Sequence, residues 1–185
     1  MLNDIINDCS AKMDKTIEAL KKDFATIRTG KANPSILNGV TVEYYGSMMP
    51  ISQIANISAP DPQSILVKPY DKSILKGIEK AIQTANLGFN PLNDGDVIRI
   101  PIPPLNEQTR KDLVKQAKKI AENNKVAIRN IRRDFMELLK KMEKDGDISE
   151  DELKRNSDKV QKVTDEFIAK IDQLTKTKES DIMSI

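Results

Sequence analysis

The chain has 185 residues, of which 38% are hydrophobic and 4% aromatic, and its 30 basic and 28 acidic side chains give a net charge of +2. That length suits one domain or two small ones with a mostly aliphatic core. The chain has one cysteine and no histidine. It therefore cannot form an intramolecular disulfide, a Ser-His-Asp or Cys-His nucleophilic site, or the usual zinc sites.

Other catalytic motifs are also missing. Carboxylate pairs are frequent but none stands out, and Thr29-Gly30-Lys31 lacks the frame of a phosphate-binding loop. We therefore expect no enzyme, no catalytic residue, no bound metal and no cofactor.

The first predicted element is an amphipathic helix over residues 1–29, which Gly30 ends. Its apolar residues recur every three or four positions: Leu2, Ile5, Cys9, Met13, Ile17, Leu20, Phe24 and Ile27. This row favours buried packing of Cys9 over a reactive thiol. The acidic start is unlike a signal or transit peptide, and no apolar run approaches the roughly 20 residues that span a bilayer. We expect a cytoplasmic protein.

Residues 30–105 have a different composition and contain all nine prolines. Strand-forming residues occupy 40–45, 64–68 and 96–101, and residues 71–85 predict a helix capped by Asp71. These elements predict a small β/α/β domain inserted between the first helix and the rest of the chain.

Two short connections join this insertion to its host, and we predict a hinge there. Glycine gives backbone freedom and prolines fix the local path. The predicted hinge residues are Thr29, Gly30, Lys31, Pro103, Pro104 and Leu105. The alternative is that Gly30 only ends a helix and the prolines only turn the chain.

Residues 110–144 form a long run without glycine or proline that carries 12 basic and 5 acidic side chains, a net charge of +7. The remainder of the chain therefore sums to −5. At about 100° per residue, one helical face collects Lys111, Lys115, Lys118, Lys125, Arg129, Arg132 and Arg133. A second face, roughly 120° away, collects Leu113, Ala117, Ile120, Ala127, Ile128, Ile131, Phe135, Leu138 and Met142. Such a stripe can simply be solvated, but the local excess of charge favours binding to anions.

The last predicted helix follows a turn at 145–147 and starts with a capping box formed by Ser149 and Glu152. Together the three long helices predict an α+β protein. It consists of an elongated antiparallel three-helix bundle, residues 1–29 plus 106–185, with the inserted domain at 30–105.

Seven short stretches between residues 27 and 165 together resemble one known family. They are Ile-Arg-Thr-Gly-Lys-Ala at 27–32, Val-Glu-Tyr-Tyr-Gly at 42–46, Ile-Glu-Lys-Ala-Ile at 78–82, Ile-Pro-Pro-Leu at 102–105, Lys-Val-Ala-Ile-Arg-Asn-Ile-Arg-Arg-Asp at 125–134, Ile-Ser-Glu-Asp-Glu at 148–152 and Gln-Lys-Val-Thr-Asp at 161–165. In order and nearly in spacing they resemble the bacterial ribosome recycling factor, over essentially the whole chain.

The resemblance implies an L-shaped monomer that is not a hydrolase. Proteins of this family bind the large ribosomal subunit and its 23S ribosomal RNA after termination. With elongation factor G and GTP, they split the ribosome and release messenger RNA and transfer RNA. Carrying over the RNA-contact helix and the hinge, we expect RNA binding by Arg129, Arg132, Arg110, Lys125, Arg133, Arg28 and Lys31. Binding should depend on salt, because cations that meet phosphates release counterions.

The sequence departs from the family pattern at the start of the long helix and at residue 31. Thr109 stands where an arginine is usual, and Lys31 keeps the charge of a frequent arginine but loses its bidentate fork. Asn106 replaces the usual threonine and can still cap the long helix.

Two other classes of function remain as alternatives. The helices could form a structural adaptor for a protein partner, with the basic stripe solvated. The stripe could instead bind anionic lipid, although the apolar face is committed to the predicted bundle, which leaves no wedge for the bilayer. We therefore expect no membrane association.

Overall fold

The computed structural model of the chain describes residues 1–85 and 87–184. The chain divides into two compact units. One contains Met1–Ile27 and Lys111–Asp181, and the other contains Arg28–Arg110 with the last residues from Ile182 onward. Ile185, the last residue of the predicted bundle, lies outside the described residues.

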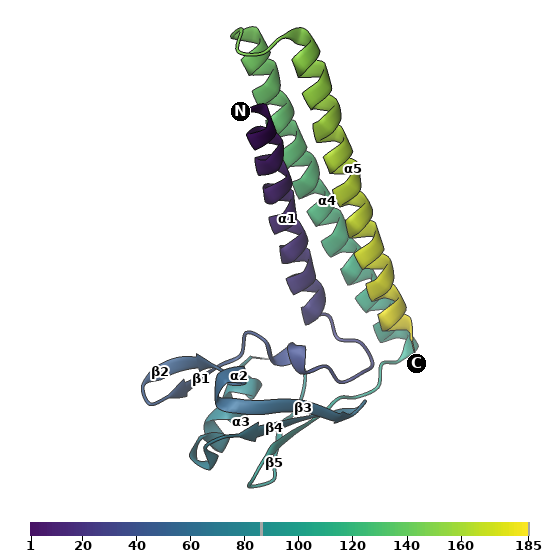
Figure 1. The fold of residues 1–185 in the computed structure, drawn as a ribbon. Helices are drawn as coiled ribbons and strands as arrows, with labels where there is room; N and C mark the ends of the chain where they lie inside the picture. Colours follow the sequence, from purple (N-terminus) through teal and green to yellow (C-terminus); the bar gives the residue numbers. More distant parts are fainter. Residues whose placement is uncertain (86, 185) are drawn as a thin grey trace. The chain divides into compact units, whose positions relative to one another are not determined.

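The first unit is a bundle of three long antiparallel helices, α1 (Leu2–Thr26), α4 (Glu107–Lys144) and α5 (Glu150–Met183) (Figure 1). In α1 the predicted apolar row is buried from Cys9 to Phe24, at spacings of three and four residues. Burial raises the pKa of the Cys9 thiol to about 11. The predicted packing role of Cys9 is confirmed.

The buried row of α4 differs in part from the predicted one. Ala117, Ile128 and Phe135 are buried as expected, but the row continues through Leu139, which has no exposed surface. Leu138, which the sequence placed on the packing face, is 41% exposed. Because α4 packs against two other helices, a partly buried row of side chains lies on each side of its fully buried row. The predicted apolar face was centred on one of these partly buried rows.

Local hydrogen bonds fix both ends of α4 and the start of α5. Asn106 Oδ1 accepts hydrogen bonds from the backbone N–H and the hydroxyl of Thr109, at 2.7 and 2.8 Å. After α4, Gly146 takes a φ of +81°, and the two N–H groups of Gly146 and Asp147 donate to carbonyls of the last turn. Ser149 and Glu152 then form the predicted capping box, with reciprocal bonds of 3.1 and 3.2 Å.

The second unit is built mainly from short antiparallel strands. Its elements in chain order are η1 (Pro34–Leu37), β1 (Thr41–Tyr44), β2 (Ser47–Pro50), α2 (Ile51–Ile54), β3 (Ala55–Asp61), β4 (Ser64–Pro69), η2 (Lys72–Ile74), α3 (Leu75–Thr84), β5 (Leu92–Asn93) and β6 (Ile98–Pro101). The strands β1 and β2 form a hairpin, and the other four form a sheet in the order β3-β4-β6-β5.

The core of this unit follows from alternation along its central strands. Ile65 and Val67 of β4, and Ile98 and Ile100 of β6, are fully buried. They belong to one apolar cluster with residues of α3 such as Ile78. This cluster is mostly aliphatic, as the composition predicts.

The sequence underestimated the number of strands. The predicted strands correspond to β1, β4 and β6, whereas β2, β3 and β5 were missed. β3 contains Pro60 at a register shift between Ser58 and Asp61, where a missing N–H is tolerated. The predicted helix also begins differently. Asp71 caps a 3₁₀ turn by accepting from the Ser73 N–H at 2.9 Å, and the α-helix starts later, at Leu75.

Two neighbouring leucines give a matched test of the α4 packing. We expect Leu139→Ala to lower the free energy of unfolding by about 2–5 kcal/mol, because it opens a cavity in the bundle. Leu138→Ala should cost less than about 1 kcal/mol, because that side chain is exposed. Urea unfolding followed by the helical circular dichroism signal checks both, and equal losses would contradict the observed orientation of α4.

Candidate nucleic-acid interface

The seven cations predicted to bind RNA fall into two groups in the structure. Lys125, Arg129, Arg132 and Arg133 lie in the middle of α4, and Arg110 lies in its first turn. Arg28 and Lys31 lie in the segment between α1 and η1. The two groups have different surroundings.

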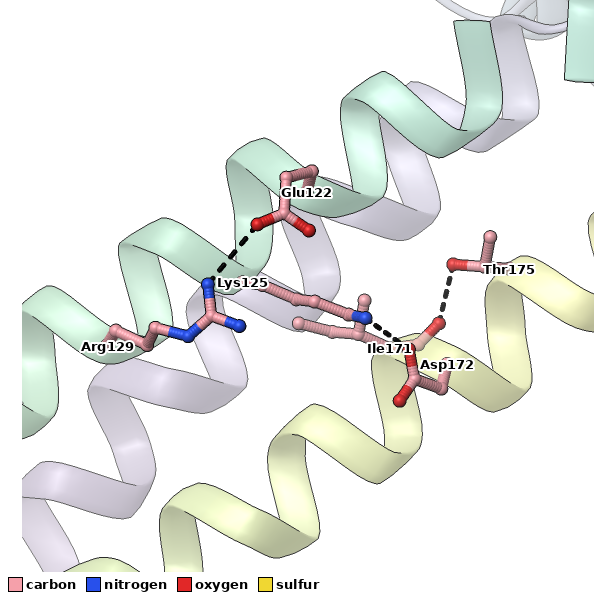
Figure 2. Close-up of polar contacts among 6 residues, drawn as sticks. All are labelled: Glu122, Lys125, Arg129, Ile171, Asp172 and Thr175. Carbon is pink, nitrogen blue, oxygen red and sulfur yellow. Dashed lines mark hydrogen bonds and ion pairs between the residues drawn. The ribbon is translucent and has the colours of Figure 1, made fainter. Parts of the chain in front are cut away.

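Lys125 reaches from α4 to α5, where its Nζ lies 2.5 Å from Oδ1 of Asp172 (Figure 2). Only 21% of the Lys125 side chain is exposed, against 58% of Asp172. The lysine stem is therefore packed along the bundle while its ammonium group meets a carboxylate near the surface.

Arg132 also reaches from α4 to α5, where its partner is a neutral side chain. Its guanidinium donates to Oε1 of Gln161 on α5 at 3.0 Å, and the amide of Gln161 donates to Oδ1 of Asp165 at 2.9 Å. Gln161 thus links the arginine to a carboxylate on α5. Lys118 completes the series, with its Nζ 4.0 Å from Oε1 of Glu179.

These contacts share one register. Lys118, Lys125 and Arg132 are seven residues apart on α4, and Glu179, Asp172 and Asp165 are seven residues apart on α5. Seven residues are nearly two turns of helix, so each row lies along one side of its helix. We call these six residues, together with Gln161, the charge ladder. The recurrence of an acidic residue every seven positions in α5 is the sequence pattern that could have predicted the charge ladder.

Arg129 lies beside the charge ladder but pairs within its own helix, with 3.2 Å between its guanidinium and Glu122 (Figure 2). Both side chains are about half exposed or more, and pairs of this kind contribute little to stability. Arg129 can therefore leave Glu122 for another anion at small cost.

Five other exposed cations of α4 lie on one face and have no hydrogen-bond or ionic partner within residues 1–85 and 87–184: Lys115, Lys119, Arg133, Lys140 and Lys144. We call them the open row. At about 100° per residue, their directions lie within roughly 60° of one another. Lys119, Lys140 and Lys144 are not among the residues of the predicted basic stripe.

Arg110, also predicted to bind RNA, contacts the C-terminal end of α5. Its Nη1 donates to the carbonyl oxygens of Met183 and Ser184, at 3.0 and 2.9 Å. A cation at the C-terminal end of a helix satisfies free carbonyls and interacts favourably with the helix dipole. In this structure Arg110 therefore closes the end of α5.

The two connections that contain the predicted hinge residues are bonded to the same turn. The Ala32 N–H donates to the Pro62 carbonyl, and the Ile102 N–H donates to the Gln63 carbonyl, both at 2.7 Å. Asp61 stabilises this turn, and its hydrogen bonds from Ser64 and then Gln63 lower the pKa of its carboxyl group. The two connections therefore lie side by side at the β3–β4 turn.

The other predicted residues of these two connections differ in their contacts and exposure. The guanidinium of Arg28 lies 5.9 Å from the ring centre of Phe89, a cation–π contact. Lys31, Pro103 and Pro104 are exposed, Leu105 is buried and Thr29 is half-buried. A Cβ added at Gly30 would meet only Nη2 of Arg110 at 3.9 Å and Cγ of Leu105 at 4.0 Å, so this conformation does not require glycine.

Two kinds of site are absent from the described residues. No group of three or more cysteine, aspartate and glutamate side chains among them is arranged to hold a metal ion. Every helix among them is too short or too polar to cross a bilayer.

The packing of Lys125 predicts a measurable coupling with Asp172. In a double-mutant cycle of Lys125→Met and Asp172→Asn, we expect a coupling free energy of about 0.5–1 kcal/mol, because the lysine is largely covered. The corresponding cycle of Arg129→Met and Glu122→Gln should give about 0.3 kcal/mol or less. Urea unfolding at low and high salt measures both, and a larger coupling for the exposed pair would contradict this ranking.

Comparison with known proteins agrees with this architecture. The family model described as ribosome recycling factor matches residues 20–183. Two relatives named ribosome-recycling factor, from a Geobacillus species and from Macrococcus caseolyticus, are 55% and 56% identical, with both chains of each pair covered in full.

Solved structures show the same fold. A solution structure of the ribosome recycling factor matches with a TM-score of 0.84 at 40% identity, and the match covers 100% of this chain and 98% of that one. A second match, with a TM-score of 0.69 at 48% identity and both chains fully covered, is to models of the T. thermophilus ribosome recycling factor and the E. coli elongation factor G bound to the E. coli post-termination complex. The resemblance read from the sequence is confirmed, and this chain belongs to the ribosome recycling factor family.

Proposed function

We propose that this protein binds the post-termination ribosome and, together with elongation factor G and GTP, splits it into subunits. Messenger RNA and transfer RNA are then released for a new round of translation. Family membership over the full chain makes it a translation factor, and the T. thermophilus relative is described with elongation factor G on a post-termination complex. The GTP is hydrolysed by the partner, because this chain lacks a phosphate-binding loop.

The observation that carries the binding step is the open row on α4. Lys115 and Arg133 are five helical turns apart and point in the same direction, about 27 Å apart along the axis. Cations spaced in this way meet phosphates along a structured RNA. We assign them to 23S ribosomal RNA in the large subunit, contacted by backbone and shape rather than by stacking, since aromatics are only 4% of the chain.

The predicted RNA-binding residues then take different parts. Arg133 and Arg129 are exposed and can grip phosphates in two places. Arg132 and Lys125 are half-buried at the edge of the same surface, and Lys31 adds an exposed charge near the proposed hinge. Arg28 and Arg110 contribute through the segments that they hold, against Phe89 and the end of α5 respectively.

The splitting step requires motion of one domain against the other. We propose a bundle domain, residues 1–29 plus 106–185, that anchors on RNA, and an inserted domain, residues 30–105, that elongation factor G pushes. The hinge lies at residues 29–31 and 103–105, and it is supported by the bonding of both connections to one turn. The factor acts as a monomer in the cytoplasm.

The first test compares two exposed arginines that have no partner within residues 1–85 and 87–184. Subunit splitting is followed by light scattering with post-termination ribosomes, elongation factor G and GTP. We expect Arg133→Ala to reduce the rate about tenfold at sub-saturating factor, since it removes a phosphate contact. The control Arg155→Ala, on α5, should split like the unaltered protein. Absence of splitting by the unaltered protein would overturn the proposed function.

The second test restrains the hinge. In Gly30→Cys/Leu105→Cys the two new thiols face each other, because a Cβ at residue 30 lies 4.0 Å from the present Leu105 Cγ. We expect the oxidised variant to bind ribosomes but not to split them, and the reduced variant to recover splitting. Buried Cys9 does not compete for the bridge. Normal splitting by the oxidised protein would exclude a hinge at these residues.

A further inference from the structure

The acidic row of α5 extends beyond the charge ladder. Asp158, Asp165, Asp172 and Glu179 follow one another at intervals of seven residues. Asp172 and Glu179 reach lysines of α4, and Asp165 is linked to Arg132 through Gln161. The same register places Asp158 opposite Leu139, and Asp158 has no partner in residues 1–85 and 87–184.

The position of the Asp172 carboxylate decides what Lys125 can do. Lys125 carries its charge at the end of a covered stem, 2.5 Å from a carboxylate that is more exposed than the lysine itself. A phosphate that approaches this ammonium group also approaches Asp172 (Figure 2). The like charge repels it, and Lys125 must exchange one anion for another.

We propose that Asp172 and Glu179 lower the affinity of α4 for RNA by competing with phosphates for Lys125 and Lys118. This inference rests on the proposed function, because it assumes that α4 binds ribosomal RNA. Each factor acts on many ribosomes in turn and must leave each of them. When the carboxylates pair with the lysines again, dissociation from RNA is favoured. The open row, which makes the first contact, is unchanged.

The test uses three amide substitutions that keep side-chain shape. Binding of the full chain to purified large ribosomal subunits is measured between about 50 and 200 mM KCl, a range over which phosphate contacts are strongly weakened. We expect Asp172→Asn to bind about three- to tenfold more tightly at low salt. The slope of log affinity against log salt should steepen by about 0.7–0.9, the value for one additional phosphate. Glu179→Gln should show a smaller gain, because its pair is longer at 4.0 Å and Lys118 is already 65% exposed.

Asp158→Asn is the matched control, since it removes the same charge from the same row without releasing a cation. We expect its affinity and salt slope to equal those of the unaltered protein. An equal gain from Asp158→Asn and Asp172→Asn would overturn the proposal, because the effect would then be one of net charge. No gain from either Asp172→Asn or Glu179→Gln would also overturn it.

A double variant identifies the released group. In Lys125→Gln/Asp172→Asn the gain of Asp172→Asn should disappear, and a retained gain would exclude Lys125 as the competing cation. Thermal melts followed by circular dichroism show that each variant is folded. Failure of the unaltered protein to bind large subunits would count against the proposed function, whereas binding without a difference among the variants would count against this inference alone.

Discussion

The antiparallel register of α4 and α5 is the constraint on which the rest of the bundle depends. One register must bury the apolar rows of both helices and also bring Lys118, Lys125 and Arg132 beside carboxylate or amide groups of α5. A shift of one residue would rotate every side chain by about 100° and break both sets of contacts at once. The short turn at Gly146, with its bonds back into α4, holds the register at one end.

The elements that the sequence predicted well are those whose signal is local. Three long helices, the cap at Asn106 and the capping box at Ser149 depend on periodicity and on hydrogen bonds between near neighbours. The strand β3 was missed because Pro60 and its polar residues form a strand only when β4 supplies the partner. The hairpin of β1 and β2 turns through Tyr45 and Gly46, both at positive φ, and tyrosine there gives no turn signal.

The sequence predicted the basic stripe of the candidate interface. It did not show that some of these cations contact α5 whereas others remain exposed. A helical wheel of α4 alone cannot show that Lys125 and Arg132 face α5, because that depends on a helix far along the chain. The division matters physically. Cations such as Arg133 are exposed and have no partner within residues 1–85 and 87–184, whereas Lys125 is largely covered and already paired with a carboxylate. The net charge of +2 shows neither the exposure of one group of cations nor the pairing of the other.

The contact of Arg110 with the carbonyls of Met183 and Ser184 has a consequence for the last turn of α5. The end of a helix usually frays, and its amides exchange with solvent through small local openings. Here the last turn of α5 is fastened to the first turn of α4, and the other ends of the two helices are joined by the Gly146 turn. Because the helix pair is closed at both ends, we expect its amide hydrogens to exchange through opening of the pair as a whole rather than by unravelling of the last turn of α5.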